Sequence, residues 1–76
     1  MPKMQKMTQI SDVAKALKKA RKQKKISQVE LGGFANITAV AISRLENEET
    51  DPQLSTILRL AQLLNVNIYI EDRSNE

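Results

Sequence analysis

The sequence of 76 residues contains no cysteine and no histidine. Without cysteine it offers no disulfide framework, no thiolate zinc site and no cysteine nucleophile, as is typical of proteins in reducing compartments. Without histidine it also lacks the side chain that most often serves as a general acid–base catalyst or a metal ligand. We therefore expect a protein that is not an enzyme and that holds no metal or other cofactor.

Long apolar stretches are missing as well. No run approaches the roughly 18 apolar residues of a membrane-spanning helix, and the N-terminus, MPKMQKMTQI, lacks the apolar centre of a secretory signal. The aromatic residues Phe34 and Tyr69 are too few for the stacked side chains that bind single-stranded nucleic acids, and we expect Phe34 in the core. These features predict one small cytoplasmic domain with no membrane partner.

Charge is unevenly distributed along the chain, although the net charge is only +3. Residues 1–25 carry nine cations against one acid, a net charge of +8, whereas residues 26–76 carry three cations against eight acids, a net charge of −5. A basic block of this kind suits a polyanion such as DNA. Such a block is more often a solvated helix face or tail, so charge alone does not establish nucleic-acid binding.

Apolar residues at helical spacing predict four helices. We place an N-terminal arm at residues 1–10 and the helices at residues 11–24, 27–35, 38–47 and 52–64. Ser27 and Glu30 form a capping box at the start of the second helix, and Ser11 and Thr38 are suitable N-caps for the first and third helices. Pro52 suits the first position of the fourth helix.

The second and third helices are separated by a tight turn. Gly32 and Gly33 each cost a helix about 1 kcal/mol relative to alanine, so we expect another part of the backbone to approach them closely. Asn36 suits a left-handed residue in the turn. Two short helices joined in this way, with small residues where they cross, form a helix-turn-helix pattern.

The fourth helix is apolar on more than one side. Its expected core stripe consists of Leu54, Ile57, Leu58, Ala61 and Leu64. Leu60 and Leu63 lie outside this stripe, so we expect a second surface to cover them.

The stretch VNIYIED, residues 66–72, is the one part of the sequence with the alternation of a β-strand. The chain offers no second strand to pair with it, and an unpaired strand edge favours association. We therefore expect antiparallel pairing with a second copy across a two-fold axis, followed by a tail at residues 73–76. The predicted dimer interface consists of Leu60, Leu63, Val66, Ile68, Tyr69 and Ile70.

The stretch SQVELGGFANITAVAISRLENEETDPQLSTILRLAQLLNV closely resembles the Cro and lambda-repressor (Xre-type) DNA-binding domain, with ALKKARKQKKI in the register of the first helix of that family. The resemblance covers about three quarters of the chain. It implies a mainly α, four- to five-helix domain in which the third helix lies in the major groove and the second crosses the phosphate backbone. Gly32 replaces the alanine that is usual in the family, and Asn36 and Lys25 replace usual turn glycines, without forbidding the fold.

The resemblance also assigns residues to roles in DNA binding. The phosphate contacts it implies are Gln28, Thr38 and Asn47. The base contacts it implies are Ala39, Val40, Ser43 and Arg44. Only Arg44 can make the bidentate contact to guanine, although it could instead be an exposed residue paired with Glu48 one turn later. Arg21 and Glu46 are expected to form a structural ion pair between the first and third helices.

The C-terminal strand is similar to that of HipB-like antitoxins, whose strands pair across the dimer axis. This resemblance implies a homodimeric repressor that binds a palindromic operator in double-stranded DNA and lies on the nucleoid when bound. It further implies autoregulation of the operon and a cognate toxin, such as a HipA-like kinase. Two alternatives stay open: a phage or host regulator without a toxin, and a helical protein-interaction module that has lost DNA readout, which Ala39 and Val40 would permit.

Overall fold

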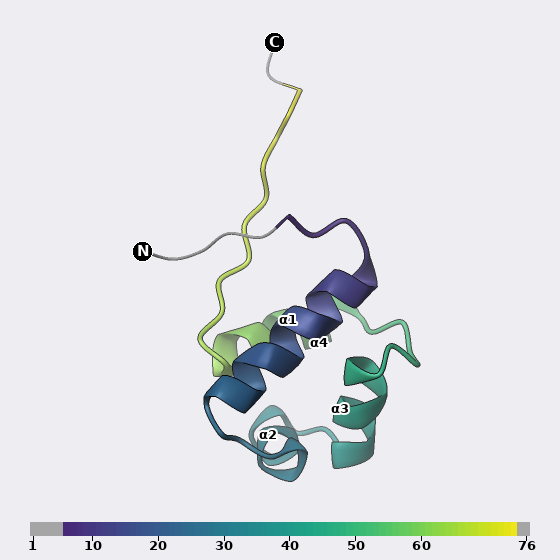
Figure 1. The fold of residues 1–76 in the computed structure, drawn as a ribbon, viewed down its shortest axis with the longest axis vertical. Coiled ribbons are helices and arrows are strands. Elements are labelled where there is room, and N and C mark those ends of the chain that lie inside the picture. Colours follow the sequence, from purple (N-terminus) through teal and green to yellow (C-terminus); the bar gives the residue numbers. More distant parts are fainter. Residues whose placement is uncertain (1–5, 75–76) are drawn as a thin grey trace.

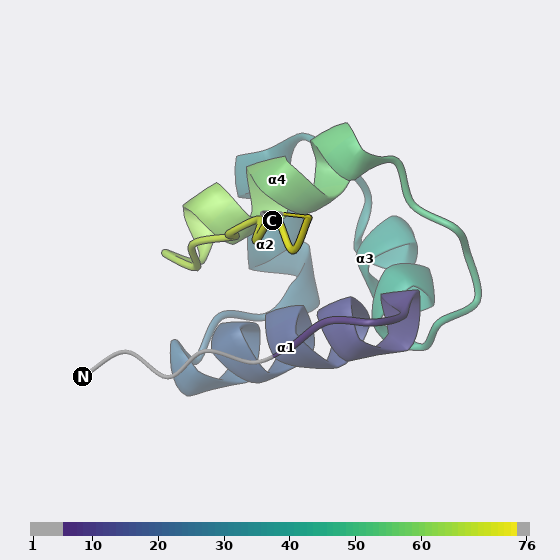
Figure 2. The same cartoon turned by 90° about the horizontal axis from the view of Figure 1, so that it is seen from above.

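The computed structural model describes residues 6–74, and this part of the chain contains four α-helices. They are α1 (Ile10–Gln23), α2 (Gln28–Ala35), α3 (Ala39–Glu46) and α4 (Leu54–Leu63). The helix α2 packs against both α3 and α4, and α1 packs against α3, as Figures 1 and 2 show. The predicted mainly α architecture is confirmed.

Side-chain caps fix the ends of the two short helices. The Ser27 hydroxyl accepts a hydrogen bond from the Glu30 amide at 3.0 Å, and the Glu30 carboxylate accepts one from the Ser27 amide at 2.9 Å. The Thr38 hydroxyl accepts a hydrogen bond from the Ala41 amide at 3.0 Å. Because each cap satisfies donors that the first helical turn leaves unpaired, α2 and α3 begin where the sequence predicts.

Two helix starts differ from the prediction. The helix α1 begins at Ile10 rather than after Ser11, because the Asp12 carboxylate accepts hydrogen bonds from the Thr8 and Gln9 amides. The Thr8 amide bond is the main reason that the pKa of Asp12 lies below its ordinary value. The helix α4 begins at Leu54, so Pro52 lies in the preceding loop rather than in its first turn.

All four helices contribute to one apolar core. Its buried residues are Ala14, Leu17, Leu31, Ala35, Ile42, Leu45, Ile57, Leu60, Ala61 and Leu64. Phe34 is not among them: 67% of its surface is exposed, because it lies on the outer side of α2. A hydrogen bond also joins α4 to α2: the Arg59 guanidinium donates to the Ala35 carbonyl at the end of α2.

The turn between α2 and α3 depends on one glycine. Asn36 has a φ of 61°, the left-handed conformation expected for it. A Cβ atom added to Gly32 would lie 2.6 Å from the Ile37 carbonyl oxygen, so the turn passes directly over this residue. Gly33 has no such neighbour within 4 Å, and the close approach expected there is wrong.

The buried face of α4 is rotated relative to the expected one. Leu60 is only 2% exposed and belongs to the core of its own chain, so it is not on the dimer surface where the sequence placed it. Leu54 and Leu58, expected in the core, are 66% and 44% exposed. A helix with leucines on several sides does not reveal from its sequence which side the other helices cover.

The chain after α4 leaves the helical body as an extended segment, seen in yellow in Figure 1. The Val66 amide still donates a hydrogen bond to the Ala61 carbonyl at 2.8 Å. From Asn67 to Glu71 the main chain makes no hydrogen bond within residues 6–74, and no strand is found there. Strand pairing across a dimer therefore stays a prediction. Of the predicted arm and tail, residues 1–5 and 75–76 lie outside the described part.

A buried ion pair joins α1 to α3. Arg21 Nε lies 2.6 Å from Glu46 Oε2, and a second guanidinium nitrogen donates to Oε1 at 3.0 Å. The remaining guanidinium nitrogen donates to the Ile26 carbonyl at 2.7 Å. Arg21 and Glu46 are 8% and 6% exposed, and the bidentate geometry satisfies both charges.

Burial by itself raises the pKa of Glu46, but hydrogen bonds from Arg21 and Gln28 and the charges of Arg21 and Lys18 lower it below its ordinary value of 4.5. The ionised pair therefore stabilises the fold above that pH. As pH falls below 4.5 and through the lower pKa of the folded state, the carboxylate becomes protonated and the stabilisation is lost.

We expect the Glu46→Gln variant to show this loss directly. Its free energy of unfolding should be lower than that of the wild type at about pH 7, because the charged partner of Arg21 is gone. The difference should shrink as pH falls below 4.5, because the wild type then loses the same charge. Urea unfolding of the wild type and the variant at a series of pH values measures the difference in unfolding free energy and its dependence on pH. A difference that is constant over the whole range would contradict this role for the carboxylate.

Candidate nucleic-acid interface

The outer side of α3 is the main candidate interface. Ile42, Leu45 and Glu46 turn inward and hold α3 against the rest of the domain. Val40 and Arg44 point outward and are exposed, whereas Ala39 and Ser43 are half-buried at the margin. The four residues expected to contact bases therefore avoid the core face. Ala41 is also exposed, and sequence reasoning did not single it out.

Arg44 is not held by a carboxylate. The only salt bridge within residues 6–74 joins Arg21 to Glu46. Glu48, the alternative partner of Arg44, has a φ of 63° and lies beyond the end of the helix, where it is no longer on the same helical face. The Arg44 guanidinium is thus available for an external acceptor.

The start of α2 offers unpaired donors beside α3. The capping box occupies the Glu30 amide, while the Gln28 and Val29 amides have no acceptor among the described residues. Free amides at a helix N-terminus, together with the helix dipole, favour an anion such as a phosphate. The ends of α3 add Thr38 and Asn47, whose side chains are exposed.

The side chain of Gln28 is partly used inside the protein. Its Nε2 donates a hydrogen bond to Glu46 Oε1 at 3.0 Å, so one of its two N–H groups remains for a phosphate. This contact connects the start of α2 to the ion pair of Arg21 and Glu46. Nothing in the sequence spacing indicated it, because Gln28 and Glu46 lie on different helices.

One further side-chain contact lies on the outer surface at α3. Asn47 Nδ2 lies 3.4 Å from the Ser43 hydroxyl, a weak contact between two residues of the outer surface.

Within residues 6–74 no group of three or more acidic, cysteine or histidine residues is placed to hold a metal ion. No helix of this part of the chain is long and apolar enough to cross a membrane.

Comparison with known proteins identifies the family. The helix-turn-helix family HTH_3 matches residues 17–70, which include all of α2, α3 and α4. No curated protein sequence matches the chain.

Several solved structures share the fold. A HipB variant in an O2 20mer complex has a TM-score of 0.82 and 28% sequence identity, covering 95% of this chain and 100% of that one. HipB in the HipA-HipB-O2-O3 complex has a TM-score of 0.81 and 28% identity, covering 93% and 100%. The P22 c2 repressor in complex with a synthetic operator has a TM-score of 0.68 and 33% identity, covering 79% and 88%.

These structures are similar in fold over most of this chain, and the family match spans the helix-turn-helix and α4 together. The chain therefore belongs to the helix-turn-helix family, as an Xre-type domain that resembles the HipB-like antitoxins.

Proposed function

We propose that this protein is a dimeric, sequence-specific repressor that binds a palindromic operator in double-stranded DNA. The observation that carries the proposal is the outward face of α3, where Arg44 has no carboxylate partner within residues 6–74, together with the free amides at the start of α2, where Gln28 contacts the end of α3. One group can read a base edge while the other holds the phosphate backbone. Similar HipB and P22 c2 repressor structures are complexes with operators or 20mer DNA sites.

The residues proposed to contact DNA divide into those that contact bases and those that contact phosphates. Arg44 donates two hydrogen bonds to O6 and N7 of a guanine, the commonest specific contact in the major groove. Ala39 and Val40 supply apolar contact to thymine methyl groups, and Ser43 reaches a base or a phosphate. Gln28, Thr38 and Asn47 bind the backbone and set the position of α3 in the groove.

The C-terminal segment supplies the dimer contact. Its main chain from Asn67 to Glu71 has unpaired amides and carbonyls, and Ile68 and Ile70 are 46% and 95% exposed. Antiparallel pairing with a second copy satisfies these groups and covers the apolar side chains. The proposed interface therefore consists of Leu63, Val66, Ile68, Tyr69 and Ile70, with Leu60 removed because it is already buried.

The proposed biological role is that of an antitoxin that represses its own operon. Support comes from the similarity to HipB in a complex with HipA. On this basis the cognate partner is a HipA-like kinase, and a gene for such a protein beside this one is the observation that would support the role. The 33% identity to the P22 c2 repressor favours the second candidate, a regulator without a toxin.

Replacing Arg44 tests the reading of bases. Arg44→Ala should lose about 1–3 kcal/mol of discrimination at one base pair of each half-site, because the bidentate contact to guanine is removed. The measurement is binding to a duplex selected from a random pool, compared with single-base variants of that duplex. Arg73→Ala removes the same charge from the tail at residues 73–76 and should leave discrimination unchanged. If Arg44→Ala weakens binding to selected and random duplexes equally, Arg44 does not read a base.

Replacing Ile68 tests the dimer. Ile68→Pro removes one main-chain amide and an apolar side chain from the proposed pairing, so sedimentation should show monomers and operator affinity should fall. Arg73→Pro, placed after the segment, is the matched control and should remain dimeric. A dimer that survives Ile68→Pro would place the interface elsewhere in the molecule.

A further inference from the structure

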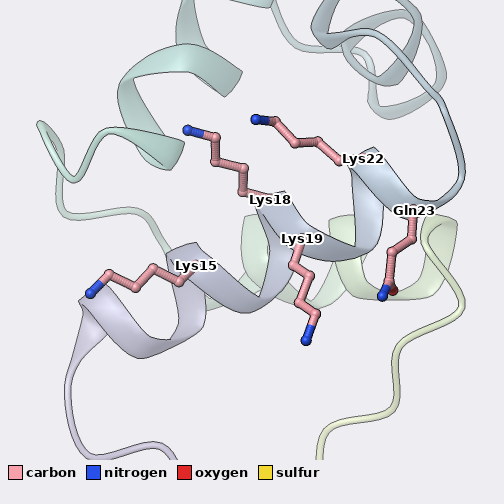
Figure 3. Close-up of a pocket in the computed structure, with 5 residues that line it drawn as sticks. All are labelled: Lys15, Lys18, Lys19, Lys22 and Gln23. Atoms are coloured by element: carbon pink, nitrogen blue, oxygen red, sulfur yellow. The ribbon is translucent and has the colours of Figure 1, made fainter.

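The exposed side of α1 carries four lysines within two turns. Lys15, Lys18, Lys19 and Lys22, together with Gln23, line a shallow hollow of about 460 Å³ (Figure 3). No carboxylate lines this hollow, and none of the four lysines forms a salt bridge within residues 6–74. Their charges are therefore available to an external polyanion.

These lysines form two pairs that point in different directions. Figure 3 shows Lys18 and Lys22 extending from α1 toward the side where α2 and α3 lie, whereas Lys19 extends the opposite way and Lys15 runs along the helix toward its start. Each pair has the four-residue spacing that places both side chains on one helical face. All four lysines line one face of α1, with Lys18 and Lys22 on the edge of that face nearer α2 and α3.

The first pair borders the proposed DNA surface. Figure 3 shows Lys18 extending toward α3, and its charge contributes to lowering the pKa of Glu46 in that helix. Glu46 is the last residue of α3 and accepts a hydrogen bond from Gln28, the first residue of α2. Lys18 and Lys22 therefore extend toward the same region as the free amides of α2.

We propose that Lys18 and Lys22 bind phosphates of the operator next to those contacted by the start of α2. The proposal rests on the function proposed above and adds α1 as a third element of the DNA surface. A lysine is a flexible point charge that suits a phosphate without reading a base. Each phosphate that it neutralises releases counterions, so the contact strengthens affinity and its dependence on salt. Lys15 and Lys19 do not take part.

The test compares two double variants with equal loss of charge. Lys18→Gln with Lys22→Gln should lower the slope of log affinity against log salt by about 0.9 for each phosphate that is no longer neutralised. Binding to selected and random duplexes should weaken by the same factor, because phosphate contacts carry no sequence information. Lys15→Gln with Lys19→Gln should leave the slope at the wild-type value. Glutamine retains a high helix propensity, and thermal unfolding by circular dichroism checks that both variants fold.

The possible outcomes separate this inference from the proposed function. A wild type whose affinity is insensitive to salt would overturn DNA binding itself. A salt-sensitive wild type with two equally weakened double variants would show a general effect of charge and overturn the assignment to Lys18 and Lys22. If the variant Lys18→Gln with Lys22→Gln keeps the wild-type slope, these two lysines do not bind phosphates of the operator, and this face is left to solvent or to an acidic protein.

Discussion

The buried ion pair between Arg21 and Glu46 is the constraint on which the proposed DNA surface depends. It joins the C-terminal half of α1 to the last turn of α3, and the same carboxylate accepts the side chain of Gln28 at the start of α2. Three helices therefore meet at one charged group shielded from water. Apolar contacts through Ile42 and Leu45 hold α3 in place without fixing its direction, whereas these hydrogen bonds have a defined geometry.

That geometry explains how groups far apart in the sequence lie together on the proposed DNA surface. The pair brings the start of α2, with its free amides, beside the end of α3, which carries Arg44 on its outer side. It also brings Lys18 and Lys22 of α1 to the same region, so part of the basic first third of the sequence lies next to α3. The uneven distribution of charge along the sequence thus corresponds to a basic side of α1 near α3.

Features set by local rules could be predicted from the sequence. The capping box of Ser27 and Glu30, the Thr38 cap and the left-handed Asn36 each depend on residues within a few positions of one another. The resemblance to a known family located the outward residues of α3 for the same reason, since the start of that helix fixes which residues face the core.

Features set by contacts between helices could not be predicted in the same way. The buried side of α4 depends on where α2 lies, so Leu60 and Leu58 were assigned to the wrong sides. The exposed Phe34 and the hydrogen bond of Gln28 to Glu46 also follow from the packing of helices. Pairing of residues 66–72 depends on a second copy, which no property of a single chain determines.

In the proposed complex, two copies of the protein place two α3 helices in adjacent major grooves on one face of DNA. Hydroxyl-radical footprinting on a duplex selected from a random pool tests it most directly. We predict two protected patches with two-fold symmetry, about one helical turn or 34 Å apart. A single patch at protein concentrations that saturate the duplex, or protection no greater than on a scrambled duplex, would contradict binding of a dimer to a palindromic operator.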